Sequence, residues 1–257
     1  MNVALDLSLI GPAFVAGLLV LATHVPLGLQ VLGRGIVFID LAIAQVAGLG
    51  VIGAELAGWE AGSAAGQAAA LGAALGGALL LTWTEKRWPD IQEALIGTLF
   101  VLAATGATLV LANNPHGGEH LKDLLVGQIL WVSRAQLLAM AAVSAAVLAL
   151  RAFAPARHAR VAFYLAFALS VTASVQLVGV YLVFASLIVP ALAVRRMRVP
   201  TLAGYVLGAL GYALGLAASL AADLPPGPVI VWMLAGLALA SVALPGTRGA
   251  RDEGSPG

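Results

Sequence analysis

The sequence predicts an all-α, polytopic integral membrane protein. Hydrophobic residues make up 61% of its 257 residues and charged residues only 10%, whereas ordinary soluble domains contain about 25% charged residues. The sequence contains successive apolar segments, each long enough to cross a bilayer as a helix. Short polar loops separate these segments. No stretch is both long and polar enough to form a separate soluble domain.

Nine apolar segments are predicted as membrane-spanning helices, because a helix that rises 1.5 Å per residue needs roughly 20 residues to cross the hydrocarbon core. Several segments are short, so tilting, re-entry or merging would give eight spans instead of nine. The segments cover residues 8–32, 36–56, 62–83, 91–112, 135–150, 161–177, 179–194, 201–222 and 228–245.

The Lys and Arg residues are distributed unevenly over the predicted loops. With nine spans and an outer N-terminus, all of them except Lys122 and Arg134 fall on one face, called the basic face below. Short cytoplasmic loops carry the excess of basic residues in membrane proteins, so this face is predicted to be cytoplasmic, and the C-terminus with it.

The two ends of the chain lead to separate expectations. Residues 1–7 contain Asp6 and no basic residue, so no cleaved signal peptide is expected and the first helix is retained. Residues 1–246 form one transmembrane domain, and residues 247–257, rich in Gly, Pro, Ser and charges, are predicted to be a disordered cytoplasmic tail.

The composition also restricts the chemistry. The chain has no cysteine, which excludes disulfides and thiolate metal sites and leaves carboxylate, imidazole and backbone oxygen as possible ligands. No Gly-rich loop followed by Lys and Ser or Thr is present, so ATP binding is not expected and a partner or an ion gradient must supply energy. No nucleic-acid partner is expected.

The hydrophobic segment 174–198 is predicted to be part of a transport pathway inside the helix bundle. Gly179 and Pro190 loosen its backbone, and loosened backbone is tolerated in a membrane only where protein or water covers it. Gln176 and Ser186 flank the Gly179 break and are candidates to line the pathway, and Pro190 offers a kink for gating.

Glycines spaced four residues apart recur along the chain. Small residues at this spacing let helices approach each other closely, so tight helix packing is predicted at each pair. The pairs are Gly62 and Gly66, Gly72 and Gly76, Gly204 and Gly208, and Gly211 and Gly215.

Collinear motifs over nearly the whole chain resemble the permease subunits of bacterial ABC importers for zinc, manganese and related divalent ions. The motifs are Pro26-Leu27-Gly28 with Arg34, Asp40-Leu41-Ala42, Glu93-Ala94-Leu95-Ile96-Gly97, Leu177-Val178-Gly179, Ser186-Leu187-Ile188-Val189-Pro190-Ala191 and Asp223-Leu224-Pro225-Pro226-Gly227-Pro228.

The resemblance implies a bundle like that of type II ABC importer permeases, in the cytoplasmic (inner) membrane of a bacterium. It implies a homodimer of permeases in lipid, two cytoplasmic ATP-binding subunits and an extracytoplasmic metal-binding protein. The chain itself would be a transport subunit and not an enzyme, with no cofactor of its own. A divalent metal, zinc first and manganese or iron next, would be its transported substrate.

The second predicted helix departs from the family pattern, which has an Asp followed four residues later by a His in the metal path. Asp40 is present, but Ala44 occupies the position of the imidazole and Gln45 stands beside it. His24 is predicted to lie at a similar depth to Gln45, roughly 15 Å from the basic face. We therefore expect His24, Asp40 and Gln45 to line a transient cation site between the first two helices.

A purely structural role is the alternative for His24 and Asp40. His24 would then satisfy backbone groups freed by Pro26, and Asp40 would cap a helix or form an ion pair near the cytoplasmic interface.

The loop 113–123 carries further candidate metal ligands on the outer face: His116, Glu119 and His120. Two roles are possible for these residues. They would capture metal weakly during its transfer from a binding protein, or they would form a simple solvated turn. A membrane metallo-enzyme is a remote alternative, because Gly117 and Gly118 loosen a segment that a zinc peptidase would need as a helix.

The second departure is the loop 151–160, which is shorter than the coupling segment that the family inserts into its ATPase. Arg157, His158 and Arg160 remain the candidate ATPase contacts, since a basic loop can touch an acidic groove. The short loop also leaves open a second function, a secondary transporter or channel of the same fold that is uncoupled from any ATPase.

Overall fold

The computed structural model describes residues 7–60, 63–111 and 125–243. The regular secondary structure of this part is all helical, joined by short connections, and contains no strand. Its α-helices, in chain order, are α1 (Leu7–Arg34), α2 (Ile39–Leu56), α3 (Ala64–Arg87), α4 (Gln92–Leu111), α6 (Arg134–Phe153), α7 (Ala159–Val194), α8 (Pro200–Ala222) and α9 (Pro226–Ala243). The predicted tail 247–257 lies outside the described residues.

Seven helices of the described part are long and apolar enough to cross a membrane, and α9 is a shorter apolar helix. The predicted spans agree with these helices to within a few residues at most ends. The range of α7 covers two predicted spans, 161–177 and 179–194, with the non-helical residue Gly179 between them. The all-α, multi-pass architecture is confirmed.

The helix α7 nevertheless consists of two arms that run in opposite directions. Gly179, at φ 77° and ψ 161°, is the non-helical residue within it. In the first arm, the Phe163 ring lies under the Arg34 guanidinium, at 4.2 Å from the ring centroid. In the second arm, Leu187 and Ala191 pack against Gly28.

Those contacts require a reversal of the chain. A straight helix would separate residues 163 and 191 by about 42 Å, whereas residues 28 and 34 lie about 9 Å apart along α1. Because both arms contact the same end of α1, the chain must fold back between them, at Gly179. Pro190 does not break the second arm, which runs as helix to Val194. The prediction of separate segments around Gly179 is therefore confirmed, and the kink for gating at Pro190 stays a prediction.

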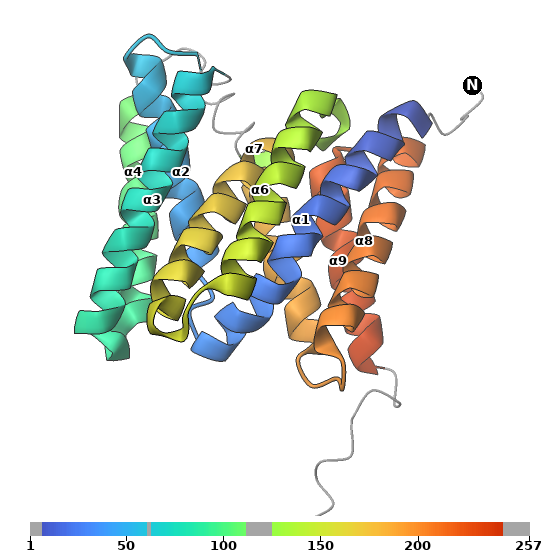
Figure 1. Ribbon diagram of the computed structural model, residues 1–257. Helices are drawn as coiled ribbons and strands as arrows, with labels where there is room; N and C mark the ends of the chain where they lie inside the picture. Colours follow the sequence, from blue (N-terminus) through green and yellow to red (C-terminus); the bar gives the residue numbers. More distant parts are fainter. Residues whose placement is uncertain (1–6, 61–62, 112–124, 244–257) are drawn as a thin grey trace, which may run out of the picture.

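The helix α7 forms the centre of the bundle. It packs against α1, α2, α3, α6, α8 and α9, and Figure 1 shows its ribbon among them. The large side chains of Tyr164, Phe167 and Leu182 are fully buried. At one side of the molecule, α2 packs against both α3 and α4, and this group joins the rest through the contacts of α2 and α3 with α7 (Figure 1).

The predicted glycine packing is confirmed on α8. A side chain at Gly204 or Gly208 would collide with Val25 or Leu21 of α1. A side chain at Gly211 or Gly215 would likewise collide with Leu234 or Ile230 of α9. These four glycines therefore let α8 approach α1 and α9 closely, as small residues do in membrane bundles.

The prediction for Gly72 and Gly76 is wrong within this chain. Both are exposed on α3, and a Cβ atom at either position would meet nothing within 4 Å. The close packing of α3 on α2 uses a different glycine, Gly50, which faces Ala69 and Ala73. Spacing alone therefore did not identify the face of α3 that packs.

Candidate functional site

Asp40 is a buried carboxylate in the first turn of α2. Its side chain is 1% exposed, and neither of its oxygens has a hydrogen-bond partner. The interpretation of Asp40 as a cap or an ion pair is therefore wrong, because the side chain makes no such contact. Burying a carboxylate without partners is costly, and such residues in membrane proteins face pathways or bound cations.

His24 is fully buried on α1, and one of its ring nitrogens is held in place. Nδ1 lies 2.9 Å from the Val20 carbonyl oxygen, 3.1 Å from Thr23 Oγ1 and 3.4 Å from Ser170 Oγ of α7. The two hydroxyls are 2.6 Å apart. A carbonyl oxygen only accepts, so we assign the proton of the neutral ring to Nδ1.

The other ring nitrogen of His24 is free to accept. Nε2 is buried and has no hydrogen-bond partner. With the proton on Nδ1, Nε2 carries a lone pair, and an imidazole whose other nitrogen donates to a carbonyl oxygen is the usual form of a histidine ligand. The alternative in which His24 satisfies the backbone freed by Pro26 is not met, because that carbonyl belongs to Ala22 and accepts a hydrogen bond from the Tyr205 hydroxyl at 3.1 Å.

The structure does not join His24 directly to Asp40. His24 faces the first arm of α7, and α7 packs against both α1 and α2. Within residues 7–60, 63–111 and 125–243, no three His, Asp or Glu side chains lie close enough together to hold a metal ion. His24 Nε2 and both Asp40 oxygens lack hydrogen-bond partners, so the two side chains are not bonded to each other, and the common site between α1 and α2 stays a prediction.

Gln45 lines a small cavity between α2, α4 and α7. The cavity has a volume of about 20 Å³, which is room for about one water molecule. Ala44, the residue in place of the family imidazole, lines it too, and α7 contributes Val175 and Val180 from the two sides of the Gly179 reversal. The remaining lining residues are Gly48, Ile52, Ala107 and Leu125.

The candidate pathway residues of α7 have different surroundings. Gly179 lies between two residues that line the cavity, whereas Gln176 is half-buried without a hydrogen bond. Ser186 points toward α8, where its Oγ lies 2.8 Å from the hydroxyl of fully buried Tyr212. Pro190 is buried within the second arm.

Three glycines hold the reversal of α7 against neighbouring segments, which the sequence did not indicate as a group. Gly127 has φ 70°, and a Cβ atom on it would collide with the backbone of Val178 and Gly179. Gly227, at the start of α9, faces the carbonyl oxygen of Val126 in the same way. The backbone N–H of Gln128 donates to the Leu177 carbonyl oxygen at 3.3 Å.

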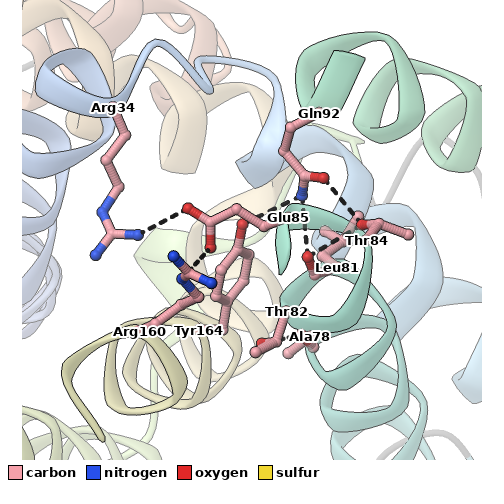
Figure 2. A network of polar contacts seen from close by, with 9 residues as sticks. All are labelled: Arg34, Ala78, Leu81, Thr82, Thr84, Glu85, Gln92, Arg160 and Tyr164. Atoms are coloured by element: carbon pink, nitrogen blue, oxygen red, sulfur yellow. Dashed lines mark hydrogen bonds and ion pairs between the residues drawn. The ribbon is translucent and has the colours of Figure 1, made fainter. Parts of the chain in front are cut away.

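At the basic face, one carboxylate receives two guanidinium groups (Figure 2). Glu85 of α3 lies 3.3 Å from Arg34 at the end of α1 and 3.2 Å from Arg160 at the start of α7. We call these three residues the Glu85 clasp. The sequence analysis did not single out Glu85; its place one residue before Lys86 and Arg87 was the available signal.

Gln92 of α4 extends the contacts beside the clasp, as Figure 2 shows. Its side-chain amide donates to the Tyr164 hydroxyl at 3.2 Å and to the Leu81 carbonyl at 3.0 Å, and accepts from Thr84 at 2.9 Å. Nearby, Glu93 accepts a 3.2 Å hydrogen bond from the backbone N–H of Phe38, just before α2.

The remaining predicted contacts lie at the two faces. The loop 151–160 is compact, with α6 ending at Phe153, a 3-10 turn at Ala156–His158 and α7 starting at Ala159. Arg157 and His158 are exposed and paired at 3.3 Å, while Arg160 is engaged by Glu85. His116, Glu119 and His120 of the outer loop lie outside the described residues.

Comparison with known proteins decides the family. The model of the ABC 3 transport family matches residues 6–155 and 153–245, nearly the whole chain. The chain belongs to the ABC 3 transport family. This confirms the expected ABC transport family and the multi-pass membrane architecture.

A solved structure shows the same fold as this ABC 3 family chain. It is PsaBC from Streptococcus pneumoniae in complex with Fab, with a TM-score of 0.75, covering 95% of this chain and 94% of that chain. The two sequences are 18% identical. No curated protein matches the chain.

Proposed function

We propose that this ABC 3 family chain passes a divalent transition metal ion into the cell, zinc first and manganese or iron next. The observation that carries the proposal is Asp40, a carboxylate that is 1% exposed and has no partner for either oxygen. A carboxylate left unpaired in this way is set to interact with a cation that passes through the bundle.

In this proposal, the cation meets weak ligands in succession. Asp40 supplies charge, Gln45 an amide oxygen at the cavity, and His24 Nε2 a buried lone pair. A single water-sized space beside Gln45 would let an ion keep part of its hydration. Gln176, Gly179, Ser186 and Pro190 of α7 would then act through the movement of its arms.

The energy and the partners belong to the same proposal. Separate ATP-binding subunits would dock on the basic face at Arg157, His158 and Arg160, and two copies of the chain would pair in the inner membrane, with the C-terminus in the cytoplasm. An extracytoplasmic binding protein would deliver the metal, with His116, Glu119 and His120 assisting its capture.

The test compares two carboxylates on the same half of the molecule. Cells expressing the chain with its partner subunits are supplied with Zn²⁺ or Mn²⁺, and accumulated metal is measured by mass spectrometry. We expect Asp40→Asn to abolish accumulation at normal expression, and Asp90→Asn, a change at an exposed residue, to preserve it. Full accumulation with Asp40→Asn would remove Asp40 from the proposed path.

One observation favours a second candidate, an ATPase-uncoupled transporter or channel of the same fold. Five residues, 154–158, join α6 to α7, which leaves little length for an inserted coupling helix. Purification of the tagged chain in mild detergent distinguishes the two candidates. A stoichiometric ATPase in the preparation supports the ABC importer, and its absence supports the uncoupled transporter.

A further inference from the structure

We propose that the Glu85 clasp is a gate that seals the cytoplasmic end of the pathway and must open for an ion to leave past Asp40. The inference rests on the proposed function in assuming that Asp40 lies on the path. It concerns Glu85, Arg34 and Arg160, which meet from α3, α1 and α7.

The geometry of the clasp is that of a closure between separate helices. Two guanidinium groups converge on one carboxylate, at 3.3 Å and 3.2 Å, and the Glu85 side chain is only 18% exposed. The Arg34 guanidinium also lies 4.2 Å from the centroid of the Phe163 ring, one turn into α7. The Arg34 contact is a charge-assisted hydrogen bond and the Arg160 contact an ion pair, so two charges from separate helices meet one carboxylate.

The clasp and the buried carboxylate are close to each other in the chain. Arg34 ends α1, and Asp40 lies in the first turn of α2, directly after the short connection 35–38. That connection is held from its other side by Glu93 of α4, which accepts the backbone N–H of Phe38 at 3.2 Å. Asp40 lies at the end of α2 that faces the basic loops. Its side chain is nevertheless only 1% exposed.

The clasp also touches the turn to which an ATPase would bind. Arg160 follows the 3-10 turn Ala156–His158 within the first turn of α7, and its side chain is 45% exposed. A partner subunit that displaced this turn would pull Arg160 away from Glu85. Arg160 is therefore the member of the clasp through which docking at the basic face would reach the α1–α2 connection.

The experiment uses the absence of native cysteines, which makes any introduced cysteine the only thiol in the chain. Ala44→Cys places a thiol at the cavity wall, at a residue that is 2% exposed. Inverted membrane vesicles containing the chain with its ATPase subunits are treated with a membrane-impermeant thiol reagent, in metal-free buffer without nucleotide. Exposed Arg196→Cys confirms that the basic face is accessible in these vesicles.

We expect slow labelling of Ala44→Cys and at least tenfold faster labelling when Glu85→Gln is added. Asp90→Asn, which removes an exposed carboxylate near the clasp, should leave the rate unchanged. A second pair keeps the test valid if Glu85→Gln folds poorly: Arg160→Gln should accelerate labelling, and Arg160→Lys, which retains the charge, should not.

Two results would overturn the gate. One is fast labelling of Ala44→Cys with the clasp intact, and the other is an equal rate with and without the Glu85→Gln and Arg160→Gln changes. Because labelling requires no metal transport, a failure of the gate is distinguishable from a failure of metal uptake in the Asp40→Asn test.

Discussion

The hydroxyl of Tyr164, on α7, accepts a 3.2 Å hydrogen bond from the side-chain amide of Gln92, on α4. The same amide donates to the Leu81 carbonyl and accepts from Thr84, both on α3. One buried polar side chain thus joins three helices, in a bundle whose other contacts are mostly apolar.

Replacing Gln92 by Leu should destabilise the protein strongly. The change removes the partner of the buried Tyr164 hydroxyl, while Thr84 keeps its bond to the Leu81 carbonyl, and an unsatisfied buried group costs about 1–3 kcal/mol. We expect the melting temperature of the detergent-solubilised protein to fall clearly. Size-exclusion chromatography after heating measures this change. Gln67→Leu, at an exposed position of α3, should cause little change.

Replacing Gly179 by Ala should prevent normal folding. Gly179 has a φ of 77° and a ψ of 161°, a region that is essentially restricted to Gly and costs another residue about 1–3 kcal/mol. The added methyl would also collide with backbone atoms of Gly127, Val126 and Leu125, which cannot turn aside as side chains do. Expression followed by size-exclusion chromatography should show little monodisperse protein.

Gly53→Ala is the matched control for that change. Gly53 is helical, and a Cβ atom there would meet nothing within 4 Å. This variant should be as stable as the parent or more stable, because Ala favours a helix by about 1 kcal/mol over Gly. Equal stability of Gly53→Ala and Gly179→Ala would contradict the role given to the reversal.

The two glycine pairs on α3 and α8 should respond differently to a larger side chain. Gly208→Leu should lower the melting temperature markedly, because Leu21 of α1 occupies the space beside it. Gly72→Leu should leave the melting temperature nearly unchanged, because the space beside Gly72 is open. The reverse order in the same thermal assay would show that α8 packs differently from the structure.

Asp40→Asn should raise thermal stability while it removes metal transport. The Asp40 carboxylate is buried without a partner, and removing an uncompensated charge from an apolar surrounding is favourable. The melting temperature measured in EDTA tests this expectation without any transport assay. A lower melting temperature for Asp40→Asn than for the parent in EDTA would show that the carboxylate has a stabilising contact.

Metal should stabilise the parent protein through the same residue. A ligand that binds only the folded state adds about 2.7 kcal/mol at one hundred times its dissociation constant. We expect Zn²⁺ or Mn²⁺ to raise the melting temperature of the parent, EDTA to reverse the change, and Asp40→Asn to lose it. An equal metal-dependent rise in Asp40→Asn would place the binding elsewhere.

Local features of the sequence determined the helical architecture. Long apolar runs and the basic loops between them predicted the spans, because a bilayer requires about 20 apolar residues in each. Gly179 predicted the reversal within α7, since a residue without Cβ can adopt the positive φ found there. The collinear motifs were sufficient to indicate the ABC 3 family, which the family match confirms.

For the candidate site, the sequence predicted burial but not the arrangement. The unpaired Asp40 and the cavity position of Gln45 agree with their proposed place on a pathway. The orientation of His24 toward Ser170 of α7 depended on how the helices packed.

The sequence by itself therefore determined which segments are helices, where α7 reverses and which charges gather at one face. Only the tertiary structure decided that Glu85 joins Arg34 to Arg160, and that Gly208 packs while Gly72 stays open. The physical reason is that residues facing lipid and residues facing other helices are both apolar, so hydropathy does not distinguish them. Contacts between helices far apart in the chain supply that distinction.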